Sequence, residues 1–159
     1  MKMTSENIII REFIESDIEF VVNANNIVND KSGLERVIDT KLSERLKSDF
    51  FPINKTKSTA QITIAELDGV SVGMIAFSFC YYMKEGDCLW VTNMFVSPEY
   101  QKMGIGTKLI DHVKDIASKN NCEIVGMLED VNNTPAQQLV EKTGAKRIDN
   151  LRYFYIKMA

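Results

Sequence analysis

The residues with the clearest chemical meaning are one glutamine and two glycines, Gln101, Gly104 and Gly106, spaced Q-x-x-G-x-G. They follow an apolar, strand-like run from Leu89 to Val96, which Ser97-Pro98 ends because proline has no amide to give a ladder. An amphipathic helix comes directly after them. Glycines at such a junction let the backbone turn tightly, and the first amides of the helix have no partners within it. The arrangement predicts a binding site for a pyrophosphate.

A glycine pair alone also fits a Rossmann-type nucleotide loop or an ordinary tight turn. A Rossmann loop would need a third glycine and an acidic residue about 20 residues further on, within a first βαβ unit. The present loop lies late in the chain and lacks that third glycine. The whole segment V-S-P-E-Y-Q-K-M-G-I-G-T instead resembles the acyl-CoA-binding motif of the GNAT superfamily of N-acetyltransferases.

A second segment carries the same resemblance. On the last helix the family typically has N-x-x-A-x-x-L-Y-x-x-x-G-F, and this chain has Asn133, Ala136, Leu139 and Gly144 in those places, with Val140 where the tyrosine stands. The resemblance implies acetyl-CoA as co-substrate and implies which residues bind it: Phe95, Val96, Gln101, Lys102, Met103, Gly104, Ile105, Gly106, Thr107 and Asn133. It also implies an oxyanion-binding amide at Phe95, beside a bulge in the same strand.

The resemblance fails at both usual proton carriers. Asn93 stands where many members have a glutamate as general base, and Val140 replaces the tyrosine that protonates the leaving thiolate. A general base contributes roughly 10²–10⁴-fold, whereas a thiol of pKa about 8.5 leaves fairly well without an acid. Glu129 is a candidate base, or else a strand-end residue in solvent. Tyr153 and Tyr155 are candidate acids or cleft-lining aromatics, or else core residues. Asn93 is a candidate ligand of the acceptor or of a water.

The implied activity is direct transfer of acetyl from acetyl-CoA to a primary amine of a small molecule or peptide. The alternative is a non-catalytic CoA-binding sensor or scaffold of the same fold, since Asn93 and Val140 remove the usual proton carriers. An acyl chain longer than acetyl is a third possibility. The family also pairs through its last strand, which makes a homodimer plausible.

The elements that must position these residues follow from local patterns. Residues 7–14 predict a first strand. Ser16 or Asp17 is placed to cap a helix that runs to about Asn26. Residues 23–31 predict a polar loop, and residues 34–48 predict a second helix. Residues 60–67 and 71–82 flank Asp68-Gly69, a strong hairpin signal, so three strands form an antiparallel meander that ends at the glycine loop.

After the loop, residues 109–117 continue a helix, residues 122–129 predict a strand parallel to the one before the loop, and residues 146–158 a closing strand. A helix between them begins near Pro135 and ends at Gly144. With the resemblance, this predicts an α/β (α+β) acyl-CoA N-acyltransferase fold. Its mixed, mostly antiparallel sheet has six or seven strands, about four helices pack on it, and one domain spans residues 1–159.

Composition sets the remaining bounds. The 159 residues are 45% apolar and 26% charged, as in ordinary globular proteins, and the net charge of −3 argues against a nucleic-acid partner. No signal-peptide layout or membrane-length apolar run is present, and the three cysteines lack metal-binding spacing. We therefore expect a cytoplasmic protein with no metal and no membrane partner.

Overall fold

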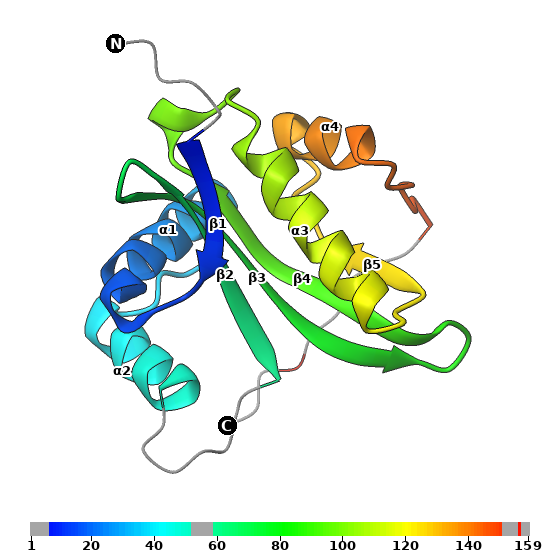
Figure 1. Cartoon of the computed structure of the whole chain (residues 1–159), viewed down its shortest axis with the longest axis horizontal. Helices are drawn as coiled ribbons and strands as arrows, with labels where there is room; N and C mark the ends of the chain where they lie inside the picture. Colours follow the sequence, from blue (N-terminus) through cyan, green and yellow to red (C-terminus); the bar gives the residue numbers. More distant parts are fainter. Residues whose placement is uncertain (1–6, 52–58, 151–155, 157–159) are drawn as a thin grey trace.

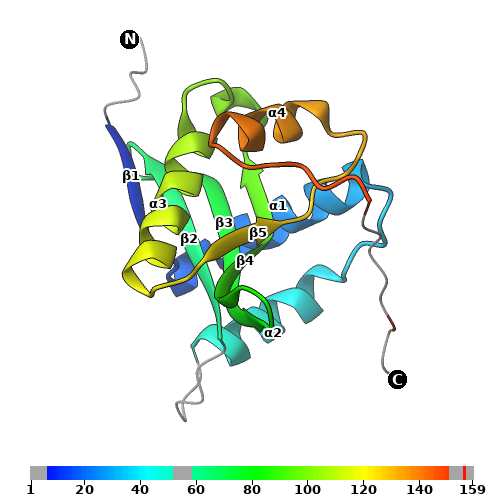
Figure 2. The same ribbon diagram turned by 90° about the vertical axis from the view of Figure 1, so that its right-hand side faces the viewer.

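The computed structural model describes residues 7–51, 59–150 and 156. One sheet has the strand order β1-β2-β3-β4-β5, and Figures 1 and 2 show α1 and α2 on one face of it and α3 and α4 on the other. The strands are β1 (Ile8–Glu12), β2 (Ala60–Leu67), β3 (Val70–Tyr82), β4 (Gly86–Val96) and β5 (Ile124–Met127). The helices are α1 (Ile18–Lys31), α2 (Asp39–Phe50), α3 (Ile105–Lys119) and α4 (Thr134–Lys142), with short 3₁₀ turns η2 (Glu15–Asp17) and η3 (Pro98–Tyr100).

The predicted meander is confirmed. Strands β1 to β4 pair antiparallel in chain order, and β5 pairs parallel to β4 after the α3 crossover. The β2–β3 hairpin turns at Asp68 and Gly69, whose φ values of 51° and 80° match the left-handed turn that Asp-Gly favours. Because α3 crosses directly from β4 to β5, the loop before α3 lies at the C-terminal end of β4.

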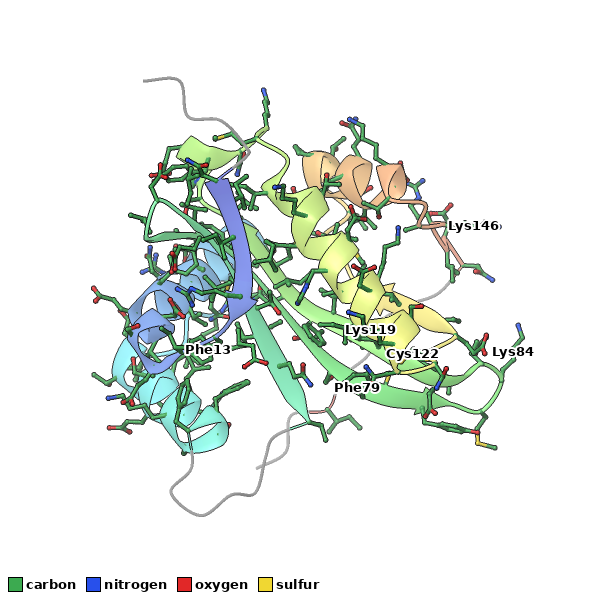
Figure 3. The ribbon with its side chains drawn as sticks, in the orientation of Figure 1. Phe13, Phe79, Lys84, Lys119, Cys122 and Lys146 are labelled. Carbon is green, nitrogen blue, oxygen red and sulfur yellow. The ribbon has the colours of Figure 1, made fainter. Side chains whose placement is uncertain are left out.

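Each face of the sheet has its own core. On the α3 face, Ile75, Phe77 and Leu89 are fully buried against Leu109 and Val113. On the α1–α2 face, the buried apolar residues include Phe13, Ile18, Val21, Val22, Ala24, Leu46, Ile62, Ile64, Met74 and Phe95. Figure 3 places Phe13 beside the first helices, and its ring centroid lies 5.5 Å from that of Phe50. The two cores fix the sheet between two helical layers.

Two local predictions are wrong, both in the first helical layer. The polar loop expected over residues 23–31 is the second half of α1, which continues to Lys31. Its asparagines are not all on a solvated face, because Ala24 and Asn26 are buried and Ile27 and Val28 pack on the α1–α2 core. Tertiary packing here overrides low local helix propensity.

The second helix begins later than its apolar pattern predicts. Leu34 and Ile38, expected on its buried face, precede α2 and are 60% and 71% exposed. Gly33 ends the α1 segment with φ of 66°, a left-handed conformation that glycine adopts without strain. The chain from Gly33 to Ile38 is therefore a connection and not a helical turn.

The described part of the sheet has five strands, against the six or seven expected. The missing one was expected over residues 146–158, where residues 146–150 form no strand and residues 151–155 and 157–159 lie outside the described ranges. Among the described helices, none combines the length and apolar character needed to cross a bilayer.

Candidate active site

The Q-x-x-G-x-G segment forms a compact loop before α3. Lys102 and Gly104 have φ values of 65° and 80°, and α3 begins at Ile105. The amide of Lys108 donates to the carbonyl of Gly104 at 3.0 Å as the first bond of the helix. Helix geometry therefore leaves the amides from Ile105 to Thr107 without a carbonyl partner inside α3. These amides and the positive end of the helix dipole suit a pyrophosphate.

The loop is tied back to the strand that precedes it. Gln101 Nε2 donates to the carbonyl oxygen of Val96 at 3.3 Å, so the glutamine of the motif links the loop to the end of β4. This bond gives Gln101 a structural role in addition to any contact that it makes with a ligand.

The two glycines of the motif serve different purposes. A Cβ on Gly104 would meet no atom within 4 Å, so its left-handed backbone is what requires glycine. A Cβ on Gly106 would lie 2.5 Å from Leu139 Cδ2 of α4, so this glycine allows α3 and α4 to approach closely. The contact brings α4 against the first turn of α3, which follows the loop.

Strand β4 carries a bulge just before the loop. Ala76 of β3 faces Asn93 and Phe77 faces Val91, so Thr92 is the additional residue on β4. The parallel pairing of β4 with β5 ends nearby, at Val91 and Met127. From Thr92 onward, β4 has no strand partner on the β5 side within the described residues. The bulge expected from the resemblance is therefore present, and the two strands diverge next to it.

Ladder alternation shows which amides face the gap between the diverging strands. Ser97 N–H donates to the carbonyl of Val72 at 2.9 Å, so every second residue before Ser97 also directs its amide toward β3. Phe95 belongs to that set, whereas Met94 and Val96 direct their amides away from β3. The carbonyl of Val96 agrees, because it accepts a bond from Gln101 outside the sheet. The oxyanion-binding amide was expected at Phe95, but the Phe95 amide faces β3. The amides that face the gap are those of Met94 and Val96.

The two residues that depart from the family pattern occupy neutral surroundings. Asn93 Nδ2 donates to Asn25 Oδ1 of α1 at 3.2 Å. Val140 is 7% exposed and belongs to the α3-side core. No local pattern singles out Asn25, because residues 23–31 predict a polar loop from their composition.

Glu129 lies just beyond β5, on the side where β4 and β5 diverge, and is half-buried. Burial raises the pKa of the Glu129 carboxyl, and the negative charge of Asp130 raises it further. A carboxylate with a raised pKa is a better base than one in water. The other acid–base candidates, Tyr153 and Tyr155, lie outside the described residues.

Asn133 is exposed at the N-cap of α4, and within the described structure its side chain makes no capping bond. Its amide group is thus directed to neither the helix nor the core.

The candidate site therefore consists of the glycine loop, which suits a diphosphate, and the amides of Met94 and Val96, which face the gap. It also includes the half-buried carboxyl of Glu129 and the hydrogen-bonded pair Asn25 and Asn93.

Comparison with known proteins relates this arrangement to one family. Residues 30–145 match the profile of the acetyltransferase (GNAT) family. Over 117 residues the chain is 32% identical to an N-alpha-acetyltransferase of Sulfurisphaera tokodaii, which covers 67% of this chain and 68% of that protein.

Solved structures share the fold over nearly the whole chain. A possible acetyltransferase from Clostridium difficile 630 superimposes with a TM-score of 0.77 at 19% identity and covers 97% of this chain and 100% of its own. A predicted acetyltransferase with acetyl-CoA from Clostridium acetobutylicum gives a TM-score of 0.70 at 19% identity, with 93% and 96% covered.

Proposed function

The chain belongs to the GNAT acetyltransferase family, with acetyl-CoA as its co-substrate, and we propose that it transfers acetyl directly to a primary amine of a small molecule or peptide. The observation that carries this proposal is the divergence of β4 from β5 beside the glycine loop. One continuous stretch of chain thereby offers amides for a diphosphate at one end and amides for a carbonyl oxygen at the other.

The donor site is assigned to the loop and to the start of α4. The amides of residues 104–107 would hold the diphosphate, with Lys102 and Met103 shaping the loop and the Asn133 side chain contacting the arm that leads to the thioester. Acetyl-CoA supplies an activated acetyl group as a thioester. The amides of Met94 and Val96 would donate to the acetyl oxygen, which gains negative charge during transfer.

Overall the amine nitrogen gains the acetyl group and loses one proton, and the thiol is released. Glu129 would accept that proton, directly or through a water. No protein group is assigned to protonate the thiolate, because Val140 replaces the tyrosine and a thiol of pKa about 8.5 is a tolerable leaving group.

A peptide α-amino group suits this site better than a lysine side chain. With a pKa of about 7.7–8.0, roughly a tenth or more of an α-amino group is neutral at pH 7, against far below a hundredth for lysine at about 10.4. An acceptor that is already partly neutral needs less help from a base, and Asn93 offers none. The relative from Sulfurisphaera tokodaii, named an N-alpha-acetyltransferase, supports the same order of preference.

Thiol release from acetyl-CoA, followed from pH 6 to 9.5 over an amine panel, tests the proposal. The panel contains short peptides with a free α-amino group, the same peptides N-acetylated but carrying lysine, a polyamine and an aminoglycoside. We expect turnover of the free α-amino peptides first. Acetyl-CoA binding in calorimetry with no turnover of any amine would favour a CoA-binding sensor instead.

A further inference from the structure

One polar contact joins α1 to β4 next to apolar neighbours. Asn25 and Asn93 are 68 residues apart in sequence, and Asn93 Nδ2 donates to Asn25 Oδ1 at 3.2 Å. Both side chains are only partly buried, and they adjoin an apolar cluster that includes Val22, Ala24 and Phe95. An apolar pair of similar size would fill this place without any need for hydrogen bonds.

The contact leaves one atom unsatisfied. Asn93 Oδ1 is buried and has no hydrogen-bond partner among the described residues. A buried carbonyl oxygen without a donor costs free energy, so a site that keeps one is suited to a donor from outside the chain. The missing partner is an N–H or O–H group, because an amide oxygen only accepts.

The unsatisfied oxygen belongs to the segment of β4 that lies beside the gap between β4 and β5. Asn93 follows the bulge at Thr92, directly precedes Met94, and lies beyond the point where β5 leaves β4. Its side chain points to the α1 side, where Asn25 holds its nitrogen. The Asn25 bond thus decides which end of the Asn93 amide is committed to the protein and which remains for a ligand.

We propose that Asn25 is a positioning residue, which fixes the Asn93 amide so that Asn93 Oδ1 accepts a hydrogen bond from an N–H of the acceptor amine. The assignment rests on the proposed transfer to a primary amine. A neutral primary amine has two N–H groups and one lone pair, so donation of one N–H to Asn93 restricts where the lone pair points. The pair orients the amine and takes no proton, since an amide is not a base at neutral pH.

Steady-state kinetics of four proteins test this role: wild type, Asn25→Leu, Asn25→Asp and Asn23→Leu. Leucine has a similar volume but accepts no hydrogen bond, whereas aspartate keeps an oxygen for Asn93 Nδ2. Asn23 is an exposed asparagine on the same helix and is the matched control. For each protein, the amine KM and kcat are measured at saturating acetyl-CoA, and the acetyl-CoA Kd by calorimetry.

We expect Asn25→Leu to raise the amine KM by about tenfold with the acetyl-CoA Kd unchanged. Asn25→Asp and Asn23→Leu should stay within about threefold of wild type. A wild-type KM in Asn25→Leu would overturn the role, and so would an equal loss in Asn25→Asp, because the hydrogen bond would then not be the cause.

A second measurement needs no variant. The Asn93 side-chain amide signal in ¹⁵N NMR should shift when a turned-over amine is added to the enzyme with CoA, and an unmoved signal at saturating amine would overturn the role. Absence of turnover by the wild type with every amine would overturn the proposed function itself. If the wild type turns over an amine and Asn25→Leu leaves the amine KM unchanged, only the positioning role is overturned.

Discussion

At the scale of single residues, the proposed proton transfer rests on one carboxyl, that of Glu129. Glu129 is half-buried, and its pKa is raised by burial and by the neighbouring charge of Asp130. Asn93 stands where many members of the family have a glutamate, and its side-chain nitrogen donates a hydrogen bond to Asn25. Among the described residues, Glu129 therefore stays our proposed base.

Glu129→Gln should lower kcat/KM for the amine by about 10²-fold, because the base is removed while the size of the side chain is kept. In the wild type, Glu129 accepts a proton only above its raised pKa, so activity should fall as the pH drops through that value. The measurement is the pH profile of kcat/KM.

Asp130→Asn is the matched variant. Removing the charge of Asp130 lowers the pKa of Glu129, so the acidic limb of the profile should move to lower pH with little change in the plateau. Identical profiles in wild type, Glu129→Gln and Asp130→Asn would show that Glu129 is not the base.

A second residue-scale prediction concerns the left-handed glycine of the loop. Gly104→Ala should cost about 1–2 kcal/mol of folding stability, because its φ of 80° is strained for alanine, and should weaken acetyl-CoA binding about tenfold. Gly33→Ala is the control, since Gly33 has φ of 66°, lies in open space and is far from the loop in sequence. Equal acetyl-CoA affinities in the two variants, by calorimetry, would contradict the loop assignment.

At the scale of elements, β4 and β5 are fitted to each other through one glycine. Trp90 of β4 faces Gly126 of β5, and a Cβ on Gly126 would lie 2.2 Å from the indole ring. The indole therefore lies across β5 where a side chain would otherwise stand. This packing fixes the strand pair just before the point where the strands diverge.

Gly126→Ala should displace the indole and destabilise the protein by about 1–3 kcal/mol, as overpacking does. Trp90 is the only tryptophan of the chain, so its fluorescence reports the displacement directly. We expect a red-shifted emission and a lower unfolding midpoint. In a Trp90→Leu background the same substitution should cost much less stability, and an equal cost in both backgrounds would rule out the contact as its cause.

At the scale of the whole molecule, one charge network joins the N-terminal elements to the sheet. Arg11 of β1 donates to both carboxylate oxygens of Asp17, at 2.7 and 2.9 Å, and to Glu66 of β2 at 2.6 Å. Ser71 of β3 and the amide of Ile14 also donate to Asp17. Burial alone would raise the pKa of Asp17, but these hydrogen bonds outweigh it and hold the pKa below its ordinary value.

Asp17→Asn should cost about 3 kcal/mol of unfolding free energy, because it removes one partner of a buried ion pair. Since the pKa of Asp17 is lowered on folding, its contribution is present above about pH 4 and is lost as the pH falls through the folded value. Urea unfolding from pH 7 to pH 3 measures both effects. Asp30→Asn, in the exposed pair with Arg36, should change the midpoint little, and an equal loss there would contradict the assignment.

Two further expectations at this scale stay predictions: one domain over residues 1–159, and a homodimer. Light scattering of the purified chain measures the second. The cytoplasmic location expected from composition also stays a prediction.

The elements with strong local signals could be predicted from the amino-acid sequence. Asp68-Gly69 specified the hairpin, the apolar run before Ser97 specified β4, and the Q-x-x-G-x-G spacing specified the start of α3. These features depend on backbone conformations that particular residue types favour, so neighbouring residues suffice to predict them. The family followed from the same motif.

Other features depend on contacts between segments that are distant in sequence. The asparagine-rich half of α1 is helical because Ala24 and Asn26 are buried, a contact that no neighbour in sequence indicates. Position 106 needs a glycine because Leu139 packs against it. The hydrogen-bond partner of Asn93 is Asn25, which lies in a segment distant in sequence. Which amides of β4 face the gap depends on its register with β3. Contacts between distant segments set each of these, and local propensity carries no information about them.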